Sequence, residues 1–247
     1  MRIYEVPDPA AFARALFIEL LRKEGIDVAS ELAHRHPSTP LPQQGGYGNL
    51  PKLAEMVSPP FAENLRLILK VSHNLHASTL PLLTAAAGGK RTLGDGLKAE
   101  RDFLVRAGVD RDGVSFGGGA GGSRADYVTP AATVQLLRHM ATRPDFPVYE
   151  RALPILGVDG TLAKSCPEGS PAKGRVFAKT GTLVWNNMLE DRGLATSKAL
   201  AGYVDTSGGK RLAFAAFVNG VHLKDGLDTK KLGSDLGQLC EIVHLER

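Results

Sequence analysis

The sequence predicts an α+β fold in which an antiparallel sheet is flanked by helices. Segments with helical periodicity dominate up to about residue 140, and strand-like segments then follow one another between residues 175 and 218. A tight turn signal, TSGGK, joins the last two strands, and a final helix closes the chain. Successive strands joined by a short turn pair antiparallel, whereas a doubly wound fold alternates strands with helices.

Composition and charge exclude several classes of protein. The chain has 247 residues, of which 43% are hydrophobic and 23% charged, as in ordinary globular proteins. The net charge is +4, but no run of five Lys or Arg residues and no basic stripe with aromatic residues supports nucleic-acid binding. The longest apolar run, Leu212 to Val218, is far shorter than the ~20 residues of a membrane span. The N-terminal segment MRIYEVPDPAAF has no signal-peptide pattern.

The N-terminal region predicts one helix followed by a long loop. Asp8-Pro9 provides an N-cap and a first helical residue, and Gly25 is placed to end the helix. Ser30 to Leu50 is polar and contains three prolines and several glycines, which favours a loop. Leu53 to Val57 is a short strand candidate.

The middle of the chain predicts four helices. Their expected ranges are Phe61–Val71, Leu75–Ala87, Leu97–Ala107 and Thr129-Pro130 to about Met140. A turn at Ser72-His73-Asn74 separates the first two helices, and Gly117 to Gly122 is predicted to be a glycine-rich loop.

The C-terminal region predicts the sheet. Arg175–Leu183, Leu200–Val204 and Leu212–Val218 read as three strands, and Lys231–Val243 as the closing helix. The segment VWNNMLEDRGLATSK, between the first two strands, is interpreted as an extended rim to a site or as a plain surface loop.

Two glycine patterns resemble known sites but lack the required context. Gly113 to Gly117 matches the G-x-S-x-G elbow around Ser115, yet a polar loop precedes it and no helix follows. The glycines of Gly117 to Gly122 match G-x-G-x-x-G without a strand before or a helix after them. The preferred interpretation is a loop that lets two backbones approach closely.

The histidines and cysteines give no metal site. The pairs His34/His36 and His73/His76 lack the third and fourth ligands that zinc sites usually offer, so no metal is predicted. The two cysteines, Cys166 and Cys240, allow one bridge or two free thiols.

Three further segments together suggest acyl-transfer chemistry. They are Ser72-His73-Asn74, Lys179-Thr180-Gly181-Thr182 and the glycine-rich segment ending at Ser123-Arg124. The first two match the S-x-N and K-T-G elements that accompany S-x-x-K in penicillin-binding proteins and class A β-lactamases.

Each residue type fits a step of that chemistry. The Ser72 hydroxyl beside an amine can relay a proton to the leaving group, and the Asn74 amide can orient polar groups. Lys179 supplies positive charge for a substrate carboxylate, which the Thr180 hydroxyl can also bind. Gly181 leaves the strand bare for an added peptide strand, and the Thr182 N–H can donate to an oxyanion.

The sequence resembles the D-alanyl-D-alanine carboxypeptidase/endopeptidase class of low-molecular-mass penicillin-binding proteins, peptidase family S13. The segments VSPPFAENLRLILKVSHNLHAS, SRADYVTPAATVQLLRHM, GRVFAKTGTL and ALAGYVDTSGGKRLAFAAFVNG follow in family order. The resemblance implies a β-lactamase/transpeptidase-like fold, of which residues 1–247 form the C-terminal portion. It also implies an acyl-serine mechanism on peptidoglycan stem peptides, acylation by β-lactams, no cofactor, and a periplasmic or extracellular location.

The chain departs from the family pattern at the nucleophile. The family's S-x-x-K lies well upstream, before inserted domains, so the fold is expected to be incomplete and an N-terminal fragment to be missing. Two S-x-x-K strings occur, Ser170 to Lys173 in a Pro/Gly loop and Ser207 to Lys210 in the hairpin turn, and both are poor helices. The alternative hypothesis is a non-catalytic module that binds peptidoglycan or a partner.

Overall fold

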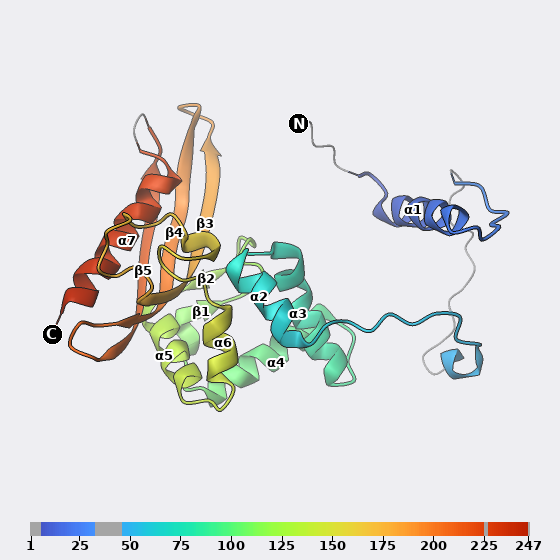
Figure 1. Cartoon of the computed structure of the whole chain (residues 1–247), viewed down its shortest axis with the longest axis horizontal. Helices are drawn as coiled ribbons and strands as arrows, with labels where there is room; N and C mark the ends of the chain where they lie inside the picture. The colour runs from blue at the N-terminus through green and yellow to red at the C-terminus, as the bar shows by residue number, and fades with distance from the viewer. Residues whose placement is uncertain (1–5, 33–45, 225–226, 247) are drawn as a thin grey trace. The chain divides into compact units, whose positions relative to one another are not determined.

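A computed structural model describes residues 6–32, 46–224 and 227–246. The chain divides into two units, Met1–Val57 and Ser58–Arg247 (Figure 1). None of the helices within these described ranges is long and apolar enough to cross a membrane.

The first unit contains helix α1 (Pro9–Lys23) and the short 3-10 helix η1 (Gly46–Asn49). The predicted N-cap is confirmed, because Asp8 Oδ1 accepts a hydrogen bond from the Ala11 N–H at 2.9 Å. Gly25 follows the helix with a φ of +81°, a conformation that favours glycine.

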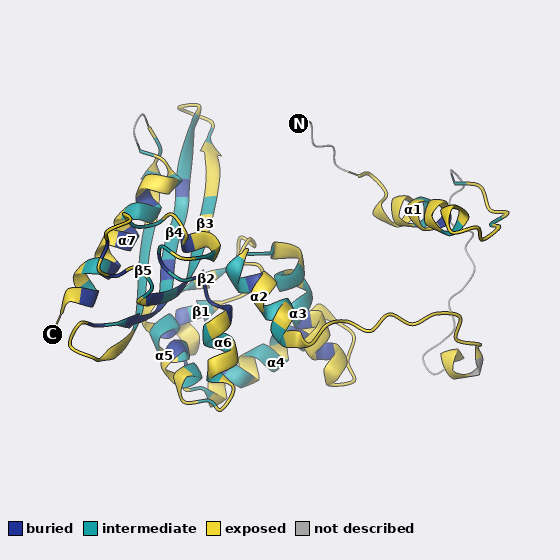
Figure 2. Ribbon diagram, in the orientation of Figure 1, coloured by how far each residue is buried: buried dark blue, intermediate teal, exposed yellow. Residues whose placement is uncertain are grey.

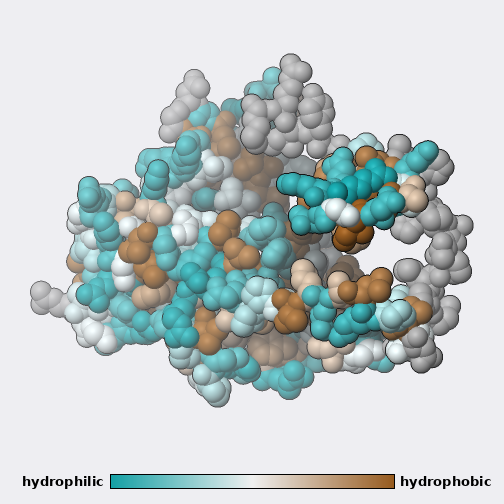
Figure 3. All heavy atoms as spheres, turned by 45° about the vertical axis from the view of Figure 1, so that its right-hand side comes forward, coloured by the Kyte–Doolittle hydropathy of each residue, from teal (hydrophilic) through white to brown (hydrophobic). Residues whose placement is uncertain are grey.

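The predicted strand at Leu53–Val57 is wrong. This segment forms no regular element, and the Leu53 and Met56 side chains are 93% and 91% exposed. A strand depends on a paired neighbour and a buried face, and neither is present for these residues in the described parts of the chain. Hydrophobic residues also lie at several other places on the molecular surface (Figure 3).

The second unit begins with the helical region. The helices there are α2 (Phe61–Lys70), α3 (Asn74–Ala87), α4 (Leu93–Arg106), α5 (Pro130–Ala141) and α6 (Phe146–Ala152). The four predicted helices are confirmed, although α4 begins earlier than expected because Thr92 caps it by accepting from the Asp95 N–H. The seven-residue α6 was not predicted, since it is too short to show a helical period.

A two-stranded ribbon frames the glycine-rich loop. Strand β1 (Val114–Ser115) pairs antiparallel with β2 (Tyr127–Val128). A Cβ at Gly119 would lie 2.1 Å from the Ala77 carbonyl oxygen, so this loop and helix α3 approach backbone to backbone, as predicted. No helix begins between Ser115 and α5, which rules out the nucleophile-elbow interpretation.

The main sheet has the order β3-β4-β5 and is antiparallel throughout, as predicted. Its strands are β3 (Val176–Asn187), β4 (Arg192–Asp205) and β5 (Arg211–His222). The first hairpin is longer than predicted: most of the segment interpreted as a rim or loop continues β3 and β4, with a β-bulge between Leu183 and Val184. Strand pairing on both sides of β4 stabilises residues whose polar character had hidden the strand.

The two faces of the sheet pack against different helices. Even-numbered residues of the strands, including Val176, Leu200 and Val204, pack with Leu236 and Cys240 of helix α7 (Thr229–Leu245). Odd-numbered residues such as Phe177 and Tyr203 pack toward α5 and α6 on the opposite face. Figure 1 shows α7 along the sheet, and Figure 2 shows buried residues on both the sheet and α7.

Candidate functional site

The S-x-N and K-T-G segments meet in the folded chain. Lys179 Nζ on β3 donates to Ser72 Oγ at 2.8 Å, although the two residues are 107 positions apart in the sequence. The same ammonium group donates to the Thr180 carbonyl oxygen at 2.6 Å. The structure therefore places the predicted hydroxyl beside the predicted amine.

Ser72 occupies a strained corner between α2 and α3. Its φ is +60°, in the left-handed region that residues other than glycine rarely adopt. His73, the next residue, caps α3 by accepting from the His76 N–H, and Asn74 is the first residue of that helix. Strain of this kind, of order 1–3 kcal/mol, persists where surrounding contacts fix the backbone, which is typical of functional sites.

A part-buried ion pair fixes this corner relative to β3. Lys70 Nζ, at the end of α2, contacts both carboxylate oxygens of Asp159 at 2.8 and 2.6 Å. Asp159 Oδ1 also accepts from the Ile155 N–H, and Ile155 forms a β-bridge with Phe177 on β3. A Cβ at Gly160 would lie 2.8 Å from the Lys70 carbonyl oxygen, so only glycine permits this close approach.

The outer edge of β3 is open beside the corner. The Ala178 N–H points away from β4, because it donates to the Pro154 carbonyl oxygen at 3.0 Å. Residue orientation alternates along a strand, so the N–H groups of Thr180 and Thr182 point outward in the same way. These two donors are available to a peptide laid along the edge.

A cavity of about 410 Å³ lies at this edge. Ser72, Asn74, Thr180 and Thr182 line it. The remaining lining residues are Thr161, Leu162, Ser165, Lys198, Ala199, Leu200, Gly233 and Leu236. The lining thus contains five hydroxyl side chains and a lysine but no Asp or Glu, a composition that suits a carboxylate ligand.

Lys198 is a functional candidate that the sequence reasoning missed. It lies opposite Thr182 in the strand register, and its Nζ donates to Thr182 Oγ1 at 2.8 Å. Burial lowers the pKa of Lys198. In the sequence, Lys198 could have been found only from its pairing with Thr182 across the β3–β4 hairpin. That pairing could not be predicted, because residues 184–198 were interpreted as a rim or a loop.

The electrostatics of Lys179 are set by its surroundings. Burial, with a contribution from the positive charge of Lys198, lowers the pKa of Lys179 to about 8. Neither lysine has a carboxylate partner among the described residues. The site is therefore cationic near neutral pH and requires little energy to release a proton.

The other predicted residues lie around this pair. Asn74 is exposed on the cavity wall, and Thr180 Oγ1 donates to Thr161 Oγ1 at 2.8 Å. Gly181 lies on the same strand face as Lys179 and presents no side chain. Ser123-Arg124 does not line the cavity.

The other candidate groups form no second catalytic pair. Ser170 Oγ donates to Glu241 Oε2 at 2.5 Å, and its S-x-x-K string lies in turns. Ser207 lies in the β4–β5 turn. Cys166 and Cys240 are free thiols. The described residues contain no group of three or more potential metal ligands, while His34 and His36 lie outside the described ranges.

Sequence comparisons match one family over almost the whole chain. A model of the D-Ala-D-Ala carboxypeptidase 3 (S13) family matches residues 2–238. A D-alanyl-D-alanine carboxypeptidase from Actinomadura sp. is 32% identical over 228 residues, covering 87% of this chain and 38% of the relative. The D-alanyl-D-alanine carboxypeptidase DacB of Haemophilus influenzae is 28% identical over 243 residues, covering 95% and 45%. The chain thus spans less than half the length of these relatives.

Structural comparisons agree with the predicted fold. Penicillin binding protein 4 (dacB) of Haemophilus influenzae, complexed with a β-lactam, superposes with a TM-score of 0.71 at 26% identity, covering 96% of this chain and 52% of that one. The TLA-1 extended spectrum β-lactamase gives a TM-score of 0.55 at 19% identity, covering 94% and 80%. The β-lactamase/transpeptidase-like fold is therefore confirmed.

The strained φ of Ser72 predicts an unusual preference for glycine. We expect Ser72→Gly to be more stable than Ser72→Ala by about 1 kcal/mol, because a left-handed conformation penalises any Cβ. Both variants lose the hydroxyl, so urea unfolding of the pair isolates the backbone effect. The matched control is Ser78, exposed within α3, where alanine should be the more stable residue by a similar amount. An alanine variant at position 72 as stable as the glycine variant would contradict the strain.

Burial of Lys179 predicts a pH-dependent contribution to stability. Its pKa is about 8 in the folded state and about 10.4 in an unfolded chain, so between these values the unfolded state binds more protons. The unfolding free energy of the wild type, relative to Lys179→Met, should therefore rise as the pH increases from 7 to 9.5. Urea unfolding at both pH values measures this difference, with exposed Lys210→Met as control. A difference that stays constant with pH would show that burial does not perturb Lys179.

Proposed function

Because the chain belongs to the D-Ala-D-Ala carboxypeptidase 3 (S13) family, we propose that it forms part of a serine-type D-Ala-D-Ala carboxypeptidase or endopeptidase. Its substrates are the stem peptides of peptidoglycan. The observation that carries this proposal is the contact of Lys179 Nζ with Ser72 Oγ beside the open edge of β3. We also propose that residues 1–247 are the C-terminal portion of a penicillin-binding transpeptidase-like domain.

The substrate peptide binds as an added strand along β3. The outward N–H groups of Thr180 and Thr182 hold its backbone, and the Thr182 N–H donates to the developing oxyanion. The terminal carboxylate binds among the hydroxyl groups of the cavity, where Lys198 supplies positive charge directly and Lys179 contributes from its position behind Ser72. Asn74, on the opposite wall, orients the peptide carbonyl through its amide.

Ser72 carries the proton to the leaving amine. Its oxygen accepts from the Lys179 ammonium, so its own hydroxyl hydrogen is free to point toward the groove. Donation of that hydrogen to the leaving nitrogen is compensated by a proton from Lys179, whose lowered pKa favours the transfer.

The acylated serine comes from a segment outside these 247 residues. A serine nucleophile and its lysine need to lie one helical turn apart, and neither S-x-x-K string of this chain lies on a helix. β-Lactams acylate that same serine. The proposed reaction uses side chains and backbone amides, and we assign it no metal and no organic cofactor. Its substrate places the protein in the periplasm or the cell exterior.

The missing helical S-x-x-K also favours a second candidate function. On its own the groove retains every proposed substrate-binding group, so the chain can act as a non-catalytic module that binds peptidoglycan peptides. Both candidate functions predict that the chain binds peptides. Only the peptidase function predicts that a longer protein carrying the nucleophile is acylated.

Peptide binding by this chain should depend on the substrate carboxylate. We expect an acetylated peptide ending in D-Ala-D-Ala to bind, and its C-terminal amide to bind about tenfold more weakly, because the amide lacks the charge that Lys179 and Lys198 attract. Isothermal titration calorimetry measures both affinities. Lys179→Met should reduce the preference for the acid, while exposed Lys210→Met should leave it unchanged. Equal binding of acid and amide would contradict the proposed groove.

Penicillin should leave this chain unmodified. After incubation with benzylpenicillin, we expect intact mass spectrometry to show no covalent adduct, because the described serines include none paired with a lysine on a helix. A longer protein that adds a helical S-x-x-K should gain one adduct per chain. An adduct on the 247-residue chain would refute an external nucleophile, and no adduct on the longer protein would favour the non-catalytic module.

A further inference from the structure

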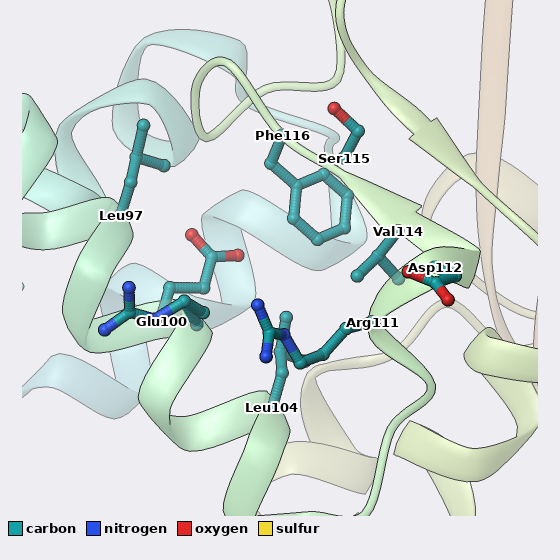
Figure 4. Close-up of a pocket in the computed structure, with 9 residues that line it drawn as sticks. Leu97, Glu100, Leu104, Arg111, Asp112, Val114, Ser115 and Phe116 are labelled. Carbon is teal, nitrogen blue, oxygen red and sulfur yellow. The ribbon is translucent and has the colours of Figure 1, made fainter.

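A second cavity, of about 250 Å³, lies between helix α4 and the segment that leads through η2 (Arg111–Gly113) into β1 (Figure 4). It shares no lining residue with the groove at β3. Its lining combines four apolar side chains, two acidic ones, two basic ones and one hydroxyl, namely Leu97, Leu104, Val114, Phe116, Glu100, Asp112, Arg101, Arg111 and Ser115.

Three of the four charged side chains, Glu100, Arg111 and Asp112, have no side-chain partner within the described ranges. Glu100 and Arg111 form neither a hydrogen bond nor an ion pair there, and they lie too far apart to pair with each other. Arg101, which also lines the cavity, differs because it is held by Asp102 at 2.6 Å. Figure 4 shows the Glu100 carboxyl group and the Arg111 guanidinium group both extending into the space between α4 and β1.

The environment of Glu100 favours a cationic ligand. The carboxyl group is half-buried, and this burial, with a smaller effect of the Asp126 charge, raises its pKa. A desolvated carboxylate without a partner costs free energy, which a bound ammonium group would recover.

The opposite side of the cavity favours an anionic group. Arg111 is exposed, and its guanidinium group can donate two parallel hydrogen bonds to a carboxylate. Leu104 is almost fully buried, and with Leu97, Val114 and Phe116 it provides apolar surface between the two charges. The volume is below the roughly 300–1,000 Å³ of drug-sized ligand sites, so it suits a smaller molecule.

We infer that this cavity binds a free amino acid with an apolar side chain, its ammonium group at Glu100 and its carboxylate at Arg111. A metal ion is disfavoured, since the described residues offer no cluster of three or more ligands. A simple anion would be repelled by Glu100, and a purely apolar ligand would leave both charges unpaired.

Leucine and two matched analogues test the inference by isothermal titration calorimetry. We expect leucine to bind the full chain, and both 4-methylpentanoate, which lacks the amine, and 3-methylbutylamine, which lacks the carboxylate, to bind at least about tenfold more weakly. Equal affinity of the three compounds, or no saturable binding of leucine in the millimolar range, would overturn the inference.

Substitutions assign the site to this cavity. Glu100→Gln and Arg111→Gln should each raise the Kd for leucine about tenfold or more, whereas Arg106→Gln, an exposed change on α4 outside the cavity, should not. Thermal unfolding without leucine identifies any variant that fails to fold. If Glu100→Gln does not fold, the leucine affinity of Arg111→Gln still tests the site, because Arg111 is exposed and its substitution should not disturb folding. Unchanged leucine affinity in a folded Arg111→Gln variant would overturn the assignment.

Discussion

The ion pair between Lys70 and Asp159 is the contact on which the candidate site depends. It is the side-chain link in a continuous path that runs from the Ser72 corner through Lys70 and Asp159 to Ile155, and from there into β3. The Lys70 side chain is 15% exposed and that of Asp159 is 40% exposed, so solvent screens the pair only in part. Removing the carboxylate would leave a part-buried ammonium group without its partner, and α2 would then be held to the sheet mainly by the apolar packing of Leu69 in the cluster around Tyr203. A contact of 2.8 Å between Ser72 and Lys179 requires that these two elements keep a fixed separation.

This path also explains why the protein tolerates a strained serine. The backbone of Ser72 is fixed on one side by α2, whose last residue passes directly over Gly160, and on the other by the capped start of α3. Glycine at position 72 would adopt the same φ without strain but would lose the hydroxyl. The fold therefore uses packing and one ion pair to hold a polar side chain where conformational preference alone would not place it.

The sequence contained enough information to bring together Ser72 and Lys179 but not the network that holds them. Their motifs have fixed spacing, and the helices and strands around them show clear periodicity. The ion pair of Lys70 with Asp159 has no such signal, because it joins residues 89 positions apart. Lys198 was missed because its part of β4 is polar and did not read as a strand. The turn before it was also obscured, because it contains the apolar residues Met188 and Leu189, which are 82% and 90% exposed. The strand expected at Leu53–Val57 failed for the converse reason, since apolar residues without a partner form no strand.

In the proposed function, Lys198 on the groove and Lys179 beside Ser72 connect substrate binding to proton transfer. Burial lowers the pKa of both lysines, and the positive charge of Lys198 lowers that of Lys179 further, so these groups carry their charge at a cost. A substrate carboxylate placed between them would stabilise the charged forms and raise both pKa values. By linkage, binding then takes up protons near pH 8, and loss of the negative ligand returns them. In the proposed function, a proton held by Lys179 while the peptide carboxylate is bound becomes easier to release as that negative charge departs. In the proposed function, Ser72, Lys179 and Lys198 thus couple recognition of a C-terminal carboxylate to the timing of proton release.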